Sequence, residues 1–247
     1  MFPIRDHNPS GRVPFVTYAL MVLNIGIFLS YAGLLNDARA INAFYVNWAM
    51  IPGLVAQGEN TMTLVSSMFL HGSWMHLAGN MLFLWIFGDN MEDEMGHIPF
   101  FIFYVVCGLG AGAVHILSGT GSMVPVVGAS GAIAGVMGGY LLMFPKARVD
   151  ILLIIVIFFR IIPIPAWIML ALWFAMQFVG AILSDPEVGG VAHWAHAGGF
   201  VVGAVLTLPL WLWRGGKAFW YETDGHPPHP EAKYKFSPSR IPKVRRR

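Results

Sequence analysis

A serine and a histidine stand at the start of two long apolar runs, where polar side chains are rare. Ser130 lies in a Gly-Ala-Ser-Gly segment, and His196 lies in an Ala-His-Ala segment. A serine hydroxyl becomes an effective nucleophile when a neighbouring base takes its proton, and histidine is the usual base near neutral pH. The pair therefore predicts nucleophilic catalysis, with Ser130 as the nucleophile and His196 as the general base.

A second polar group is suited to bind the negative charge that such a reaction creates. Ser73 is a suitable helix N-cap, and it would place His76 and Asn80 four residues apart on one helix face. A tetrahedral oxyanion needs hydrogen-bond donors. The side chains of His76 and Asn80 could supply them, together with the backbone N–H of Ser130 at a helix N-terminus.

The elements that must position these residues are membrane-spanning helices. The chain of 247 residues is 56% hydrophobic and 11% charged, whereas soluble domains are about 25% charged. Several apolar runs approach the roughly 20 residues that a helix needs to cross a bilayer. We predict an all-α membrane protein with six spans, at residues 15–35, 73–87, 98–117, 130–144, 164–183 and 193–213. The run 151–159 is predicted as a shallow interfacial segment or as an extension of a neighbouring span.

Basic residues indicate how this bundle is oriented. Cytoplasmic loops keep Lys and Arg, whereas translocated loops lose them. With six spans, Arg39 is the one basic residue outside the cytoplasmic side, so both termini are predicted to be cytoplasmic. The second, fourth and sixth helices then start at the outer face. Ser130, His196, His76 and Asn80 are thus expected at one depth just below that face.

Glycines near the serine and the histidine favour close helix packing. Gly131 and Gly135 share one helix face, and Gly199 and Gly203 follow His196 at spacings of three and seven residues. Small residues at this spacing allow helix backbones to approach closely in membranes. Two such faces would hold the hydroxyl and the imidazole within hydrogen-bond reach.

The chain is predicted to form one domain, residues 15–213, after a cytoplasmic segment, 1–14. The tail, 214–247, is basic and rich in proline, so it is expected to be flexible and cytoplasmic. Its charges are interpreted as solvated, with binding to anionic lipid headgroups or to a partner as the alternative. Four acidic residues after the second helix are interpreted as a solvated turn: Asp89, Glu92, Asp93 and Glu94.

Simpler interpretations exist for each residue alone. A Gly-Ala-Ser-Gly segment is common at helix interfaces, and a lone histidine often only hydrogen-bonds between helices. The combination favours catalysis. Four histidines, His71, His76, His193 and His196, also suggest a metal site. No acidic residue or cysteine is placed to complete such a set, so no metal or other cofactor is expected.

Three motifs in this order resemble the rhomboid intramembrane serine proteases. They are the segment 69–80, which reads FLHGSWMHLAGN, the segment 128–131, and the segment 195–199 followed by Gly203. The resemblance covers about residues 15–213. Two positions depart from the family pattern: Met62-Thr63 stands where a Trp-Arg pair is often found, and Ala134 stands where an aromatic residue often follows the serine by one turn.

The resemblance implies a six-helix bundle with a short fourth helix and a water-filled cavity open to the outer side. It assigns the dyad to Ser130 and His196 and the oxyanion donors to His76 and Asn80. It also implies that His71 is structural, and we expect the same of Gly128, Gly131 and Gly199.

The implied activity is that of a serine endopeptidase that cuts transmembrane proteins near the outer face. A catalytically silent relative that binds transmembrane clients is the main alternative, and a transporter or metal-binding protein is the third. Expected partners are transmembrane substrates and membrane lipids, without nucleic acid. The predicted location is a prokaryotic plasma membrane. The fifth span, 164–183, carries bulky aromatic residues that suit a laterally moving gate.

Overall fold

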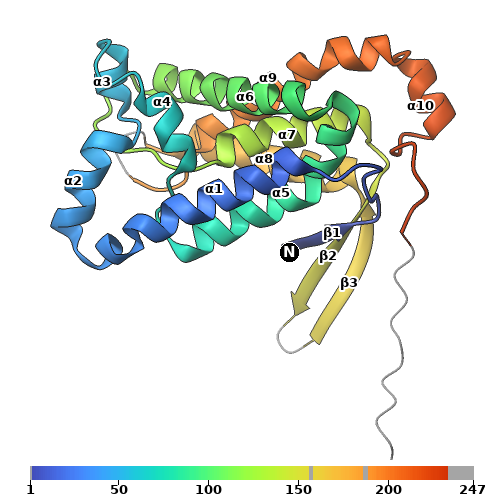
Figure 1. Ribbon diagram of the computed structural model, residues 1–247, viewed down its shortest axis with the longest axis horizontal. Helices are drawn as coiled ribbons and strands as arrows, with labels where there is room; N and C mark the ends of the chain where they lie inside the picture. Colours follow the sequence, from blue (N-terminus) through green and yellow to red (C-terminus); the bar gives the residue numbers. More distant parts are fainter. Residues whose placement is uncertain (1, 156–157, 186–188, 233–247) are drawn as a thin grey trace, which may run out of the picture.

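The protein is a bundle of long helices that run side by side (Figure 1). The structure is a computed structural model that describes residues 2–155, 158–185 and 189–232. The longer helices are α1 (Phe15–Tyr31), α5 (Trp74–Met95), α6 (His97–Ser118), α7 (Ser130–Met143), α8 (Ala166–Leu183) and α9 (His193–Trp213). All six predicted spans are thus largely helical.

Shorter elements gather at the two ends of the bundle. Between α1 and α5 lie η1 (Ala32–Asn36), α2 (Ala38–Trp48), α3 (Pro52–Ala56), α4 (Thr63–Ser66) and η2 (Ser67–Phe69). At the opposite end lie β1 (Phe2–Asp6), β2 (Arg148–Ile155), β3 (Phe158–Pro165) and α10 (Lys217–Thr223). Figure 1 shows α2 and α3 at one end of the long helices, here named the loop end, and the sheet and α10 at the other, named the sheet end.

Four helical segments of the described chain are long and apolar enough to cross a membrane. They are Phe15–Asn36, His97–Ser118, Ala166–Leu183 and His193–Trp213, and α7 is a shorter apolar helix of 14 residues. A mostly helical membrane protein is therefore confirmed. The number of crossings and the side on which the termini lie stay predictions.

The run 151–159 is not an extension of either neighbouring span. It belongs to an antiparallel sheet of order β1-β2-β3, in which Ile151 pairs with Ile162 and Leu152 with Ile161. β-branched residues favour strands over helices, and the run is rich in isoleucine and valine. Residues 156 and 157 of this run lie outside the described residues.

The centre of the bundle depends on glycines at the contact of α7 and α9. A Cβ atom at Gly203 would lie 1.9 Å from the carbonyl oxygen of Gly135, and one at Gly199 would lie 2.1 Å from that of Gly131. Only hydrogen atoms fit between these backbones. The predicted close approach of α7 and α9 is therefore present on the α9 side, whereas a Cβ atom at Gly131 or Gly135 would first meet Ala111 or Cys107 of α6.

We expect Gly203→Ala to destabilise the protein. The added methyl group overlaps the α7 backbone, which cannot move aside as a flexible side chain would, so the cost is about 1–3 kcal/mol or more. The melting temperature in detergent, followed by circular dichroism, measures the effect. Gly26→Ala in α1 is the matched control, because a Cβ there has no neighbour within 4 Å among the described residues. Equal melting temperatures for the two variants would contradict the packing argument.

The interpretation of the acidic residues as a solvated turn is wrong for Glu92. Helix α5 continues through these residues and ends before Gly96, whose φ of 81° suits glycine. Glu92 is 1% exposed. Its carboxylate accepts hydrogen bonds from the backbone N–H groups of Val16 and Thr17 at 2.8 and 2.7 Å and from the Thr17 hydroxyl at 2.7 Å. A carboxylate at this place satisfies the N-terminal donors of α1 and fixes that helix against α5.

A second polar cluster joins β1 to the sheet end of α7. The Asn8 side-chain amide donates to the Tyr140 hydroxyl at 3.0 Å, and that hydroxyl lies 3.4 Å from the Asp6 carboxylate. Burial, together with the nearby charge of Asp89, raises the pKa of Asp6 to about 8.

Stability should therefore depend on the charge of Asp6. Between about pH 4 and pH 8 the folded protein holds a proton on Asp6 that the unfolded chain releases, so the free energy of unfolding falls as the pH rises. Asp6→Asn imitates the protonated form and should flatten this fall. Denaturant unfolding in detergent at pH 5, 6.5 and 8 tests the expectation. An unchanged pH slope in Asp6→Asn would assign the dependence to other groups.

The tail is partly ordered, although the sequence predicts a flexible segment from residue 214. Helix α10 places Trp220 against the ring of Trp211, with 4.8 Å between ring centroids, and its indole N–H donates to the Leu142 carbonyl at 2.9 Å. The prediction rested on the average composition of the tail, which does not show that Trp220 can pack against α9. Residues 233–247 lie outside the described residues.

Candidate active site

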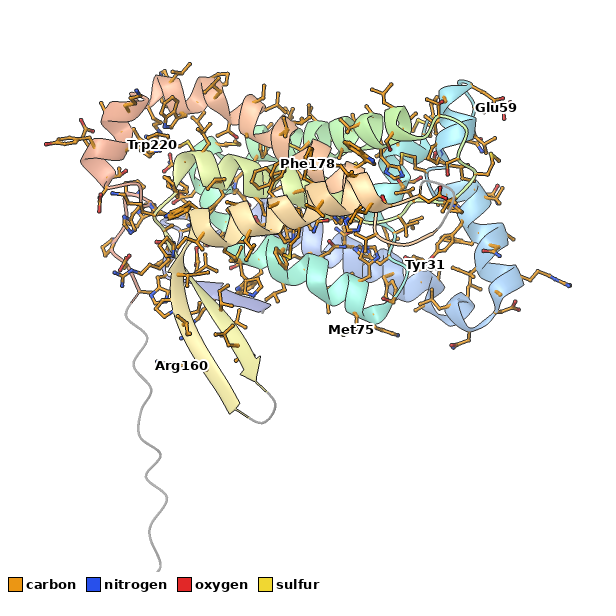
Figure 2. The ribbon with its side chains drawn as sticks, turned by 180° about the vertical axis from the view of Figure 1, so that it is seen from behind. Tyr31, Glu59, Met75, Arg160, Phe178 and Trp220 are labelled. Atoms are coloured by element: carbon orange, nitrogen blue, oxygen red, sulfur yellow. The ribbon has the colours of Figure 1, made fainter. Side chains whose placement is uncertain are left out.

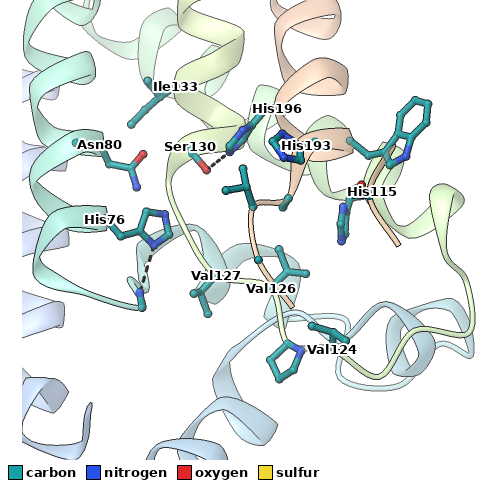
Figure 3. A pocket seen from close by; sticks show the side chains of 18 of the residues that line it. His76, Asn80, His115, Val124, Val126, Val127, Ser130, Ile133, His193 and His196 are labelled. Carbon is teal, nitrogen blue, oxygen red and sulfur yellow. Dashed lines mark hydrogen bonds between the residues drawn. The ribbon is translucent and has the colours of Figure 1, made fainter. Parts of the chain in front are cut away.

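Ser130 and His196 meet at the loop end of the bundle. The Ser130 Oγ and the His196 Nε2 are 2.7 Å apart, a hydrogen bond between the first residue of α7 and the first turn of α9 (Figure 3). The two residues are 66 positions apart in sequence. The structure thus brings together the two side chains that the sequence predicts as nucleophile and base.

Backbone geometry around Ser130 aims its hydroxyl at the histidine. Gly128 has a φ of 135°, which L-residues with a side chain rarely adopt, and its N–H donates to the Ser67 carbonyl at 2.9 Å. This turn begins α7 at Ser130. The glycine contacts described above then hold the start of α9 at the distance that one hydrogen bond requires.

His76 projects from α5 toward the same point. Ser73 caps this helix as predicted, because its hydroxyl accepts from the backbone N–H of His76 at 3.1 Å. The Nδ1 atom of His76 accepts from the backbone N–H of Gly72 at 3.3 Å. A neutral imidazole carries one proton, so Nε2 is the donor. A Cβ built on Gly128 would lie 2.8 Å from that Nε2 and 3.3 Å from the Ser130 Oγ, so both atoms border the same small space.

Asn80 lies one turn further along α5 and faces the same space (Figure 3). It is 7% exposed, and its side-chain nitrogen finds no hydrogen-bond partner within the described part of the chain. Asn80 also lines the cavity described below, so its amide can donate to a group that enters the cavity. Asn80 and His76 therefore offer two donors beside the hydroxyl.

His71, for which the sequence predicts a structural role, does not line the space beside the Ser130 hydroxyl. It is fully buried, and the Tyr31 hydroxyl accepts from its backbone N–H at 2.5 Å and donates to its carbonyl at 2.9 Å. Its ring meets the ring of His76 edge-on, with centroids 5.1 Å apart. His71 thus fixes the segment before α5 and supports the His76 ring from behind.

Sequence reasoning missed Gln177 of α8. Its side-chain oxygen lies 2.8 Å from the Nδ1 of His196 and 2.9 Å from the Nδ1 of His193. One signal was available: Gln177 is the single amide or charged residue in the apolar sequence of α8, and polar residues in such segments are functional candidates.

Helix α8 also supplies an aromatic neighbour for the histidine. The Trp173 ring lies 5.9 Å from the His196 ring, tilted by 32°. Ala134, which stands where the family often has an aromatic residue, is buried in the core. From the sequence, the span that contains Trp173, 164–183, was assigned only to a gate. The contact of Trp173 with His196 is therefore a second feature of the site that the sequence did not predict.

A cavity of about 520 Å³ opens beside these residues at the loop end. Its lining comes from α5, α6, α7, α8 and α9 and from the connections that precede α7 and α9, and it includes Ser130, His196, His76, Asn80, His115, Trp173 and His193. A cavity of this size holds several waters or a short stretch of extended peptide. Among the described residues, no group of three or more His, Cys, Asp or Glu side chains is arranged to hold a metal ion.

Comparison with known proteins shows which family the chain resembles. The rhomboid domain family model matches residues 58–213, more than half of the chain. Rhomboid-like protein 11, chloroplastic, of Arabidopsis thaliana is 30% identical over 207 residues, which are 84% of this chain and 68% of that protein. Rhomboid protein 1, mitochondrial, of Saccharomyces cerevisiae is 26% identical over 77% of this chain and 51% of its own length.

A human relative is similar to a smaller part of this chain. The presenilin-associated rhomboid-like protein, mitochondrial, is 30% identical over 66% of this chain and 38% of its own length. The chain thus spans about half the length of the yeast relative and less of the human one. The matched region contains Ser130, His196, His76 and Asn80 together. This chain belongs to the rhomboid family.

Proposed function

We propose that this protein is an intramembrane serine endopeptidase that hydrolyses peptide bonds in or beside transmembrane segments of other membrane proteins. The observation that carries the proposal is the 2.7 Å hydrogen bond between the Ser130 Oγ and the His196 Nε2 at a cavity within an apolar helix bundle. A pair that only held helices together would need neither the cavity nor the unpaired donor of Asn80 beside it.

The proposed first half of the reaction is acylation of Ser130. His196 Nε2 takes the hydroxyl proton as Oγ bonds to the carbonyl carbon of the substrate. The carbonyl oxygen becomes an oxyanion, which the Nε2–H of His76, the amide of Asn80 and the backbone N–H of Ser130 are placed to bind. The imidazolium then gives its proton to the leaving amine as the carbon–nitrogen bond breaks.

Water completes the proposed cycle. A water molecule in the cavity gives a proton to His196 as its oxygen attacks the acyl carbon, and the second oxyanion uses the same donors. Collapse of this intermediate breaks the ester bond, and the proton returns to the Ser130 Oγ. The cavity is needed because the apolar surroundings would otherwise exclude the water that hydrolysis consumes.

Six crossings with cytoplasmic termini are part of this proposal. Helices α5, α7 and α9 begin at the loop end, and basic residues of the described chain gather at the sheet end: Arg5, Lys146, Arg148, Arg160, Arg214 and Lys217. Arg39 of α2 lies at the loop end. The distribution fits the positive-inside rule if the sheet end is cytoplasmic, and the cavity then opens on the outer side.

The membrane in which the protein resides is a separate matter. The relatives named above are chloroplast and mitochondrial proteins, and they lend no support to a prokaryotic plasma membrane. The proposal is therefore an integral membrane protein with lipids and transmembrane substrates as its partners, whichever membrane holds it.

Cleavage of a single-pass membrane protein by the purified chain in liposomes tests the function. Wild type should release product, and Ser130→Ala and His196→Ala should each reduce kcat by at least about 10³-fold. Ser30→Ala and His226→Ala, which change residues remote from the cavity, serve as matched controls. Product from every variant would mean a contaminating protease, and capture of uncut substrate by wild type would favour the silent, client-binding relative.

The oxyanion donors give a separate expectation. Asn80→Leu keeps the volume of the side chain and removes its donors, so kcat should fall about 10²–10³-fold while KM changes little, because the lost bond forms chiefly in the transition state. His76→Ala should act in the same direction. Steady-state kinetics on the same substrate measures both variants. A rise in KM at constant kcat would instead place Asn80 in ground-state substrate binding.

A further inference from the structure

Resting on the proposed function, we infer that Gln177 is a positioning residue that sets the tautomer of His196 and makes the base depend on the docking of α8. The inference concerns the face of α8 that meets α9, which neither the sequence motifs nor the family match singles out. It is carried by the contacts of one amide oxygen.

The first step is to establish which ring nitrogen of His196 carries the proton. The side-chain oxygen of Gln177 carries no hydrogen, so the Nδ1 of His196, 2.8 Å away, must be the donor. A neutral imidazole has one N–H, so its Nε2 keeps a lone pair and can accept from the Ser130 hydroxyl at 2.7 Å. Gln177 thus favours the one tautomer that can act as a base.

The second step is that His193 holds Gln177 in this orientation. The Nδ1 of His193 lies 2.9 Å from the same oxygen, so two N–H groups of α9 point at one acceptor on α8. The closeness of the helices depends on Gly180, where a Cβ atom would lie 2.7 Å from the His193 ring. Trp173, Gln177 and Gly180 are spaced by four and three residues, so they share one face of α8.

The third step concerns what else could orient the base. The titratable groups that face His196 are His76 from α5, His115 from α6 and His193 from α9. No carboxylate among the described residues hydrogen-bonds to its ring. The neutral amide of Gln177 therefore takes the orienting place that a buried acid occupies in a Ser-His-Asp triad.

The fourth step is the position of α8 in the bundle. Only 17% of its apolar window is buried, the smallest share among the four apolar helices that could span a membrane. Figure 2 shows α8 in front of the other long helices, and Phe178 of α8 is 46% exposed. A lateral displacement of this helix would withdraw Gln177 and Trp173 from His196 together. The base is then about tenfold more effective while α8 is docked, the factor that one lost hydrogen bond implies, which ties proton transfer to closure of the site.

Two near-isosteric substitutions separate this role from simple packing. Gln177→Met fills the same volume without an acceptor, and Gln177→Glu keeps an acceptor at the same place. We expect Gln177→Met to lower kcat about tenfold at an unchanged KM, since one hydrogen bond is lost. The rate at which a fluorophosphonate modifies Ser130 should fall by the same factor. Gln177→Glu should recover most of both rates.

The pH profile gives a readout that packing does not move. A carboxylate beside Nδ1 stabilises the imidazolium, so the acidic limb of the rate profile of Gln177→Glu should shift to higher pH than that of wild type. Gly180→Ala should reproduce the loss seen in Gln177→Met, because the methyl group displaces His193 and separates α8 from α9. Met176→Leu, on the exposed side of α8, is the matched control.

The outcomes distinguish this inference from the proposed function. If wild type is modified at Ser130 and cleaves substrate, while Gln177→Met equals wild type at matched melting temperature, the positioning role is wrong and the protease stands. A loss in Gln177→Met that Gln177→Glu does not recover would also overturn it, because packing would then explain the loss. Wild type that neither cleaves nor reacts with the reagent would overturn both.

Discussion

The backbone contact between α7 and α9 is the constraint on which the rest of the site depends. A serine at the first position of one helix and a histidine in the first turn of another share a hydrogen bond only if the helix axes are unusually close. Gly199 and Gly203 make this possible because a Cβ atom at either position would collide with the α7 backbone at Gly131 or Gly135. In lipid there is little hydrophobic force between helices, so this contact is held by close packing and by the hydrogen bond between Ser130 and His196.

Most polar side chains of the site form a hydrogen bond with a neighbouring group. The N–H of Gly72 sets the proton of His76, and Tyr31 holds the segment around His71 behind it. Within the described residues, the exceptions are the amide nitrogen of Asn80, the Nδ1 of His115 and both ring nitrogens of His71, which are buried without a hydrogen-bond partner. In the proposed function the amide of Asn80 pairs with the oxyanion, which would give this donor beside the Ser130 hydroxyl a partner.

Sequence could predict the parts of this site that come from strong local signals. Ser130, His196, His76 and Asn80 are polar residues at helix starts, so motif and spacing located all four. The sheet could not be found in this way, because an apolar run such as residues 151–159 suits a strand or a helix, and only pairing with β1 and β3 decides. Glu92 was misjudged for a similar reason: its partners, Val16 and Thr17, lie 75 residues or more away. Gln177 depends on the rotation of α8 about its axis, which composition does not show.

Helices α7 and α8 differ in how much of their surface is buried, so we expect α7 to be immobile and α8 to be able to move. Helix α7 is enclosed, and every residue from Gly131 to Tyr140 is buried, so Ser130 cannot move without unpacking the core. Helix α8 meets the bundle along a single face and exposes the remainder of its surface. In the proposed function, a substrate segment enters from the lipid by displacing a helix, and we propose α8 because it has the smallest buried share of the four apolar helices. Because the same helix carries the acceptor for His196 Nδ1, the proposed access and the proposed proton transfer favour opposite positions of α8, so the proposal requires α8 to return to the bundle before Ser130 reacts.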